Sequence, residues 1–546
     1  MTETEDNTEK QFEIDESLPT KTPKFRESDA GDGTRREDHL LTGLRFYICV
    51  ISLILCMFLV ALDQMVTTAV LTVIADQFHE FNKITWITAA FLMPMGCCAQ
   101  VWGRLSISFG RKWIMISGML LFEVGSLITG VSNSMNMFIG GRAIQGIGAS
   151  CIQTCVMVIA NEITTIDKKP ILISCLGLTF VVASVAGPAI GGALGTYSSW
   201  RWCFYLNLCC GAIIFPFFMF TYNPKPPIGS FKEKLQTVDF IDSGLMISTF
   251  VLLLLGISFG QTEASWKTAS VICCFTLGGL TLIAFLIFNF KYSENPVIPA
   301  NIVKKPAIVV SFFAFAFNYS VLVVMMQFTS IYFQNVLGNT AFHTGISLIP
   351  VAVATSLVAI ANGILMRKTR LIKELCVAGS IILPISVGLM LLLNVEKNVG
   401  NYIGFQILLG AATGMNFQGP MISALIAAPK DPGSTILTTS LFNFGRSTGS
   451  ALFSLIAGAI YTETLKSHIR NVGPQLQEHQ IPLLDIIVRT DLIQELSSHD
   501  KKLVLTAIME SIHDVFWLAL AIAITALLFS IFMSNKKLPK SEEVEA

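Results

Sequence analysis

Four ionisable side chains lie deep inside long apolar stretches of the sequence: Asp63, Glu123, Arg142 and Arg446. An ionisable side chain in the hydrocarbon core of a membrane costs about 2.5 to 3.5 kcal/mol on insertion scales, so such a residue is a functional candidate by default. The chemistry that this set offers is the uptake and release of protons.

Asp63 is flanked by Ala61, Leu62, Met65 and Val66. A carboxyl group in such surroundings can load and release a proton as a cavity opens to either side of a membrane. The alternative is a carboxylate that is permanently paired with an arginine for structural reasons. We favour the coupling role because the sequence does not identify a partner.

Arg142 keeps its proton, so it must contact a carboxylate, carbonyl oxygens or a watery cavity. Gln145 follows three residues later and shares its helix face. We expect Arg142 to bias a nearby acid between its charged and neutral forms, with Gln145 and Gly146 supporting it. Glu123 is a further candidate for proton coupling, and a hydrogen-bonded structural glutamate is an equal alternative. The predicted coupling set is therefore Asp63, Arg142 and Glu123.

Glycine is dense in the apolar stretch 171–195, which contains Gly187, Gly191 and Gly192. Small residues allow the backbones of membrane helices to approach closely. Pro188 removes a helix hydrogen bond in the middle of the stretch. We expect these four residues to form a thin, bent wall between two halves of the protein.

Four phenylalanines cluster in a later apolar stretch: Phe312, Phe313, Phe315 and Phe317. Aromatic faces attract cations, so the cluster could line a pocket for flat cations. The alternative, which is more common, is that the rings face lipid and neighbouring helices.

The elements that must position these side chains are membrane-spanning helices. The 546 residues are 53% hydrophobic and only 14% charged, too few charges to cover a soluble protein of this size. A helix needs roughly 20 apolar residues to cross the hydrocarbon core. The sequence contains about fourteen such runs. They are 45–67, 84–105, 113–132, 135–160, 171–195, 202–222, 240–260, 269–289, 307–333, 343–366, 374–394, 401–427, 434–461 and 510–533.

Segments outside these runs define the orientation. Residues 1–44 and 534–546 are polar and are expected to be cytosolic tails, the first of them disordered. Lysine and arginine are concentrated in the loops on the same side as these tails, as the positive-inside rule requires. The loop 462–509 on the far side is expected to contain amphipathic helices lying on the surface, as a spacer or a lid.

Several motifs in the first half make the chain resemble the major facilitator superfamily, and within it the fungal drug:proton antiporters with fourteen spans. Gly103, Gly110, Arg111 and Lys112 resemble the gating loop between the second and third helices of that family. The tract from Gly141 to Gly148 resembles its fourth helix, the tract from Gly187 to Gly192 its antiporter motif, and Leu62 to Val66 its first-helix signature. The tract from Trp200 to Asn207 resembles the start of its sixth helix.

The resemblance implies an all-α membrane fold with two six-helix halves, 45–222 and 307–533, and a linker, 223–306, that carries two additional spans. Two departures stand out. Ile107 replaces the acid of the gating loop, so the charge lock that this acid makes in the family cannot form in the same way. Cys209 replaces a proline after Asn207.

The resemblance implies a monomeric, proton-coupled antiporter that exports small, often cationic, organic compounds across the plasma membrane. The alternative is a transporter of basic amino acids in the vacuolar membrane. A more remote alternative is a nontransporting sensor on a transporter scaffold, for which the tails are short. The sequence has neither a phosphate-binding loop nor a protease signature, so we expect no enzyme, cofactor or bound metal. The formal net charge is zero and gives no indication of nucleic-acid binding.

Overall fold

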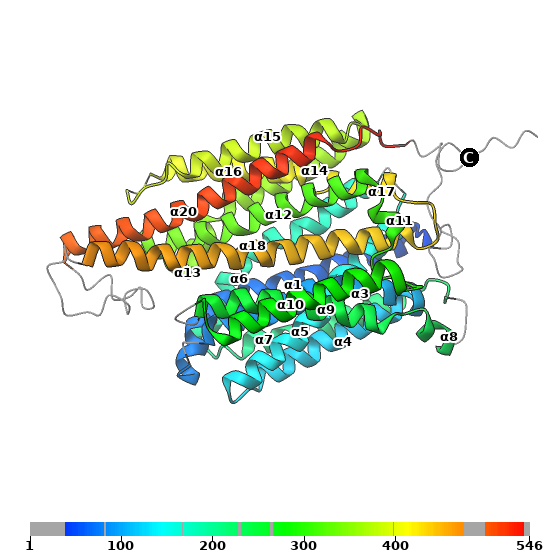
Figure 1. Ribbon diagram of the computed structural model, residues 1–546, viewed down its shortest axis with the longest axis horizontal. Coiled ribbons are helices and arrows are strands. Elements are labelled where there is room, and N and C mark those ends of the chain that lie inside the picture. Colours follow the sequence, from blue (N-terminus) through cyan, green and yellow to red (C-terminus); the bar gives the residue numbers. More distant parts are fainter. Residues whose placement is uncertain are drawn as a thin grey trace, which may run out of the picture.

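The computed structural model describes residues 39–80, 83–165, 168–227, 231–262, 266–396, 398–473 and 497–539. The regular secondary structure of these residues is helical. Most of the expected tail 1–44 and the centre of the loop 462–509 lie outside the described residues. The long helices run roughly side by side along the longest axis of the molecule (Figure 1).

The first group of helices forms the lower half of the molecule in Figure 1. It comprises α1 (Gly43–Phe78), α2 (Ile84–Cys97), α3 (Ala99–Phe109), α4 (Arg111–Gly130), α5 (Met135–Glu162), α6 (Lys169–Tyr197) and α7 (Trp202–Thr221). The expected span 84–105 is thus interrupted at Cys98, four residues after Pro94. Gly110 ends α3 with a φ of 89°, a conformation that residues with a side chain rarely adopt.

The second group forms the upper half. It comprises α12 (Pro306–Ile331), α13 (Ala341–Ser347), α14 (Ile349–Thr369), α15 (Lys373–Met390), α16 (Val399–Asn416), α17 (Gly419–Ala427), α18 (Ser434–Val472) and α20 (Ser498–Ile531). The expected span 401–427 is divided, because the helix is broken between Asn416 and Gly419.

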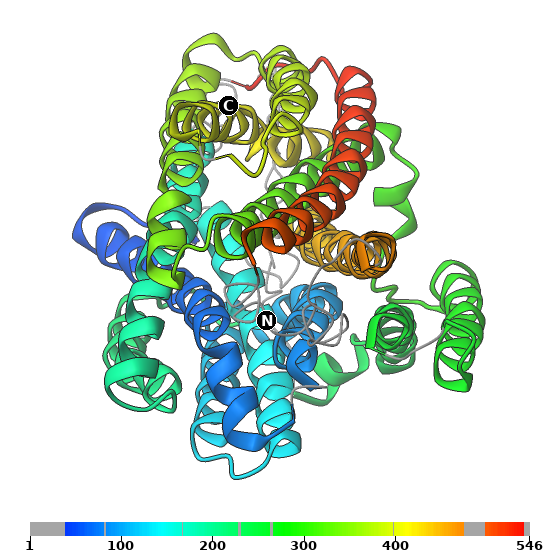
Figure 2. The same ribbon diagram turned by 90° about the vertical axis from the view of Figure 1, so that its left-hand side faces the viewer.

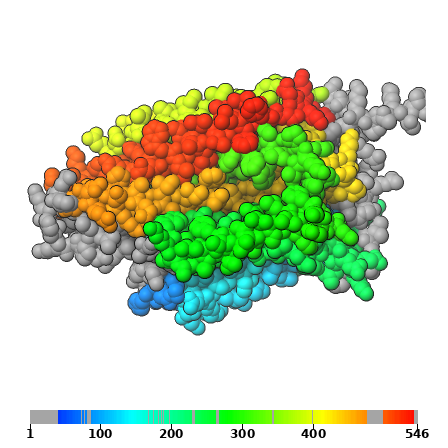
Figure 3. Space-filling model, in the orientation of Figure 1, coloured from blue at the N-terminus to red at the C-terminus, as the bar shows by residue number. Residues whose placement is uncertain are grey.

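The segment between the two groups contains α8 (Phe231–Gln236), α9 (Phe240–Thr262), α10 (Ala269–Ile287) and α11 (Ala300–Val303). Helix α9 packs against α2 and α18, and α10 packs against α9. The pair stands at the edge of the bundle in Figure 2 and lies across the boundary between the two groups in Figure 3. The outer face of α10 exposes Ile272, Leu277, Leu280 and Ile283, as expected for a helix that faces lipid.

The two groups meet in a repeated way. Helix α6 packs against α14, and α18 packs against α2 and α3. If α2 with α3, α13 with α14, and α16 with α17 are each counted as one span, the fifth span of each group contacts the second span of the other. Gly103 of α3 is essential to one of these contacts. A Cβ atom at Gly103 would lie 1.9 Å from the Ser440 hydroxyl oxygen of α18, so no other residue fits without a shift.

The expectation of surface-lying helices in the loop 462–509 stays a prediction, because residues 474–496 lie outside the described residues. Helix α18 continues without a break to Val472, and α20 begins at Ser498. Both ends of the loop are therefore extensions of membrane helices. His468 on the first extension lies 3.3 Å from both Glu510 and Asp514 on α20, which joins the two helices.

Ten helices among the described residues are long and apolar enough to cross a membrane, and two shorter apolar helices lie within α2 and α6. The protein therefore has a membrane-spanning, all-helical architecture.

Candidate functional site

Asp63 lies at the centre of a buried polar cluster between α1, α4, α5 and α7. Arg142 of α5 contacts it with 2.6 Å between the guanidinium nitrogen and the carboxylate Oδ2, and both side chains are 1% exposed. The amides of Gln145 and Asn207 each donate a hydrogen bond of 2.7 Å to the other carboxylate oxygen. Two helices, α5 and α7, thus supply donors to one carboxylate on a third, α1.

Arg142 is held on several sides. Its guanidinium donates to the Gln145 side-chain oxygen at 2.6 Å, which fixes the orientation of that amide. It also lies 4.3 Å from the centre of the Phe91 ring and 5.8 Å from that of Phe204, distances at which an aromatic face attracts a cation. The close approach of α2 and α5 depends on Gly146, where a Cβ atom would lie 2.3 Å from the Phe91 carbonyl oxygen.

The cluster brings together Asp63, Arg142 and Gln145, which the sequence identified as candidates. The premise that Asp63 has no identifiable partner is wrong, because Arg142 is that partner. The sequence did not identify Asn207 or Ser126 as site residues. Ser126 of α4 accepts hydrogen bonds from Gln145 at 2.8 Å and from Asn207 at 3.2 Å. The available signal was an asparagine within the otherwise apolar helix α7.

Glu123 lies one helix turn from Ser126 on α4. Its side chain packs over Gly211 of α7, where a Cβ atom would be 2.0 Å from the Glu123 Oε1. The other carboxyl oxygen is buried and has no hydrogen-bond partner among the described residues. Glu123 is close enough to Asp63 for their charges to interact, but no hydrogen bond joins it to the cluster.

The predicted gating-loop residues occupy the opposite end of α4. Arg111 forms a two-pronged ion pair with Glu162 at the end of α5, with nitrogen–oxygen distances of 2.9 to 3.1 Å. Lys112 donates to the Met219 carbonyl oxygen at 2.7 Å and to the Asn223 side chain, which ties α4 to the end of α7. Ile107, in place of the acid, is buried.

Gly187 and Gly191 of α6 face α1, which belongs to the same group of helices. A Cβ atom at Gly187 would lie 2.3 Å from Met65 Cβ, and one at Gly191 would lie 2.8 Å from the Val66 carbonyl oxygen. A Cβ atom at Gly192 would meet nothing within 4 Å. The expected wall between the halves is therefore wrong for Gly187 and Gly191, which instead allow α6 to approach α1. Pro188 lies within α6, and its side chain is outside the described residues.

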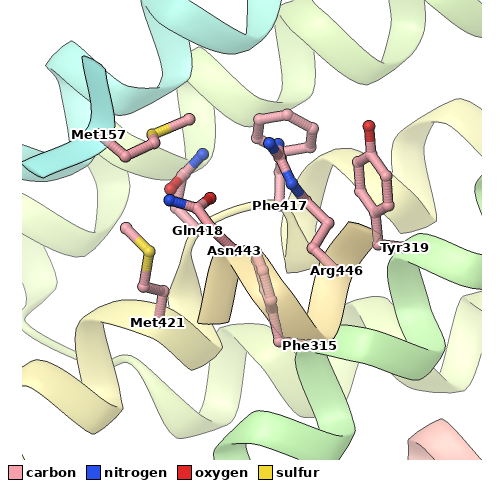
Figure 4. A pocket seen from close by; sticks show the side chains of 8 residues that line it. All are labelled: Met157, Phe315, Tyr319, Phe417, Gln418, Met421, Asn443 and Arg446. Carbon is pink, nitrogen blue, oxygen red and sulfur yellow. The ribbon is translucent and has the colours of Figure 1, made fainter. Parts of the chain in front are cut away.

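A second polar cluster lines a small cavity between the two groups of helices. Figure 4 shows the residues around it: Met157, Phe315, Tyr319, Phe417, Gln418, Met421, Asn443 and Arg446. Arg446 is 2% exposed, and its guanidinium carbon lies 5.0 Å from the Tyr319 ring centre and 6.0 Å from that of Phe180 on α6.

The sequence raised two alternatives for the phenylalanine cluster, a pocket lining and a surface that faces lipid and neighbouring helices, and the four rings divide between them. Phe315 lines this cavity. Phe312 lies over Gly445, whereas Phe313 is 37% exposed and stacks with Phe317 on the outer side of α12. The cluster as a whole therefore does not form one aromatic pocket.

Comparison with known proteins agrees with this architecture. The family model of the Major Facilitator Superfamily matches residues 53–454. The chain is 30% identical to the vacuolar basic amino acid transporter 5 of Saccharomyces cerevisiae, over 94% of this chain and 96% of that protein. It is 29% identical to the azole resistance protein 1 of the same yeast, over 93% and 91% of the two chains.

The fold is also similar to that of a solved structure. A bacterial homologue of the human lysosomal transporter Spinster, in an inward-facing and unoccupied conformation, superposes with a TM-score of 0.56 and 15% sequence identity, over 89% of this chain and 96% of that one. This likeness shows the fold. The family match across most of the sequence and the similarity to a transporter over nearly its whole length point to a transporter and not to an enzyme. The chain belongs to the major facilitator superfamily.

Proposed function

We propose that the chain is a proton-coupled antiporter that exports small, often cationic, organic compounds in exchange for protons. The observation that carries this proposal is the buried carboxylate of Asp63, which accepts hydrogen bonds from Arg142, Gln145 and Asn207. A carboxylate held by donors from separate helices links its protonation state to the positions of those helices.

The proposed coupling step is a change in the Asp63–Arg142 contact. When Asp63 binds a proton, its attraction for the guanidinium falls from that of an ion pair to that of a neutral hydrogen bond. Arg142 cannot lose its own charge and must then find other acceptors, such as the Ile87 carbonyl oxygen, 3.4 Å from its Nε. Protonation thus favours a different arrangement of α1 relative to α2 and α5.

Glu123 is the second acid in this proposal. Its unpartnered oxygen lies buried beside α7, and a buried carboxyl oxygen without a donor is costly when charged. Glu123 lies one helix turn from Ser126, which accepts hydrogen bonds from two of the donors of Asp63. We propose that Glu123 passes or shares the proton that Asp63 carries.

Arg111, Lys112, Gly103 and Gly110 are proposed to stabilise one conformation at the cytosolic end. The Arg111–Glu162 ion pair holds α4 against α5 there. Gly103 permits the contact between the two groups of helices.

The membrane arrangement follows the same proposal. We infer fourteen spans, because four further helices or helix pairs accompany the ten long apolar helices: α2 with α3, α6, α16 with α17, and α18. The domain boundaries 45–222, 223–306 and 307–533 then separate two six-helix halves and a linker with two spans. We place both tails in the cytosol and propose a monomer in the plasma membrane.

The second candidate function is a vacuolar transporter that exchanges basic amino acids for protons. It is favoured by the similarity to a yeast protein named as such, which extends over nearly the whole length of both chains. A nontransporting sensor remains the more remote alternative.

Reconstitution into proteoliposomes tests the proposal. Vesicles with an acidic interior are given rhodamine 6G or labelled L-arginine, and accumulation is measured before and after an ionophore collapses the pH gradient. We expect accumulation of the dye that the ionophore abolishes. Gradient-dependent accumulation of arginine alone would favour the vacuolar function, and accumulation of neither compound would contradict both.

A further inference from the structure

Arg446 is a buried cation that forms no ion pair with an acid in the part of the chain that the structure describes. The side chain is 2% exposed, and no acid lines the cavity that it faces (Figure 4). One of its terminal nitrogens is buried and without a hydrogen-bond partner among the described residues. This is the opposite of Arg142 and Arg111, each of which contacts a carboxylate. A guanidinium stays charged inside a protein, and a buried charge without a partner is strongly unfavourable.

The neighbours of Arg446 are also incompletely satisfied. Asn443, one helix turn away on α18, has a buried amide nitrogen without an acceptor. Gln418 has a buried side-chain oxygen without a donor. All three polar groups line the same cavity, whose remaining lining consists of aromatic and methionine side chains. The cavity is therefore lined by two hydrogen-bond donors, on Arg446 and Asn443, and one acceptor, on Gln418. These three atoms have no hydrogen-bond partner among the described residues.

The backbone around the cavity is interrupted. Gln418 lies in the break between α16 and α17, where the helical hydrogen bonds are not continuous. In transporters, broken helices near the centre of the membrane occur where the backbone lines a binding site. The cavity also lies between the two halves, since Met157 belongs to α5 and the other lining residues belong to α12, α17, α18 and the break before α17.

The cavity is separate from the cluster around Asp63. Arg142 and Met157 lie on the same helix, and 15 residues of α-helix span roughly 22 Å. Next to Arg446, Ser447 donates to the Gln153 side chain of α5 at 3.1 Å, which keeps this part of α18 against the N-terminal half.

We infer that this cavity binds the anionic oxygen group, a carboxylate or its equivalent, of a flat or zwitterionic organic solute, with Arg446 as the anchoring residue. The planar guanidinium matches the two oxygens of a carboxylate. Asn443 and Gln418 would complete the polar end, and Phe315, Tyr319 and Phe417 would cover the apolar body. This inference rests on the proposed transport function and narrows its substrates, since a cationic solute that also carries an anionic oxygen group would bind more tightly than one that lacks it.

Two pairs of probes that differ in this group test the inference. Rhodamine 110 has a free carboxylate that is a methyl ester in rhodamine 123, and L-arginine has a carboxylate that agmatine lacks. Binding is measured by competition in proteoliposomes for the wild type, Arg446→Gln and Arg446→Lys. We expect the wild type to prefer the carboxylate member of at least one pair by about tenfold or more, since hydrogen bonds between charged groups are the strong ones.

In Arg446→Gln the preference is expected to fall close to one, while affinity for the ester or for agmatine is retained or rises. Arg446→Lys should retain part of the preference, and it replaces the glutamine variant if the latter does not fold. The inference is overturned if the wild type shows no preference for a carboxylate, or if the variants that fold keep the full wild-type preference. Proton-driven uptake of all four probes is measured in the same vesicles. If proton-driven uptake is present but the wild type shows no preference for a carboxylate, only this inference is refuted. If none of the four probes shows proton-driven uptake, the proposed function is refuted.

Discussion

Gly191 and Gly192 are adjacent residues of α6 that offer a matched pair of substitutions. A Cβ atom at Gly191 would lie 2.8 Å from the Val66 carbonyl oxygen and 2.9 Å from the Ala69 Cβ, both on α1. Non-bonded carbon atoms prefer about 3.5 to 4.0 Å, so α1 and α6 would have to separate by roughly half an ångström. At Gly192 a Cβ atom would meet nothing within 4 Å.

Both alanine variants gain the same helix propensity, about 1 kcal/mol relative to glycine. Gly192→Ala should therefore be as stable as the wild type or slightly more so. Gly191→Ala adds the cost of overpacking, typically about 1 to 3 kcal/mol, and should be less stable than Gly192→Ala by a similar amount. The Gly191→Leu variant should show a larger loss.

The difference in stability is measured by thermal unfolding of the purified variants in detergent, followed by size-exclusion chromatography with fluorescence detection. Transport in proteoliposomes shows whether the less stable variant also loses exchange. We expect a lower melting temperature and impaired or leaky exchange for Gly191→Ala only. Equal melting temperatures and equal transport for the two alanine variants would refute the close approach of α1 and α6 at Gly191.

Three further substitutions test other contacts. Arg142→Lys keeps the charge but loses the planar set of donors, so transport should fall by about tenfold or more with unchanged protein levels; wild-type transport would show that only the charge matters. Glu162→Ala leaves the buried Arg111 without its counter-ion and should destabilise the protein by about 3 to 5 kcal/mol, and an unchanged melting temperature would show that this pair is dispensable. Gly103→Ala should impair stability and exchange, and Ser440→Gly in the same chain should restore both; lack of any effect of Gly103→Ala would refute the contact between α3 and α18.

The chemistry of the Asp63 cluster could be predicted in part because charge is conspicuous in an apolar helix. Asp63 and Arg142 stand out by type, and Gln145 follows from helical spacing. Asn207 and Ser126 do not stand out, since uncharged polar residues are common in membrane helices and often bond to their own backbone. Ser126 does so, donating to the Phe122 carbonyl oxygen at 2.9 Å.

Pairing between helices is the part that local sequence does not determine. The partners Asp63 and Arg142 are 79 residues apart, and Arg111 and Glu162 are 51 residues apart. Their contacts depend on the depth and rotation of whole helices, which tertiary packing decides. The same reason explains the error over the α6 glycines, whose composition indicates a close approach without identifying α1 as the neighbour.

The loop 462–509 shows a different limit. Its described ends are polar continuations of α18 and α20. A mixture of charged and apolar residues is compatible with a helix that projects from the membrane and equally with a helix that lies on its surface. Hydropathy locates the apolar part of a helix and not its end.

The central claim is that Asp63 carries the coupled proton, and transport by Asp63→Asn with and without a pH gradient tests it most directly. Exchange of labelled for unlabelled substrate at equal pH needs no net proton movement, so Asp63→Asn should retain exchange while it loses accumulation driven by the gradient. In Asp63→Asn the buried Arg142 loses its carboxylate partner, which could destabilise the fold. The double variant Asp63→Asn with Arg142→Gln removes this unpaired charge and so controls for misfolding. Asp514→Asn, a half-exposed acid on α20, is the matched control and should accumulate substrate normally. Full gradient-driven accumulation by Asp63→Asn would contradict the claim.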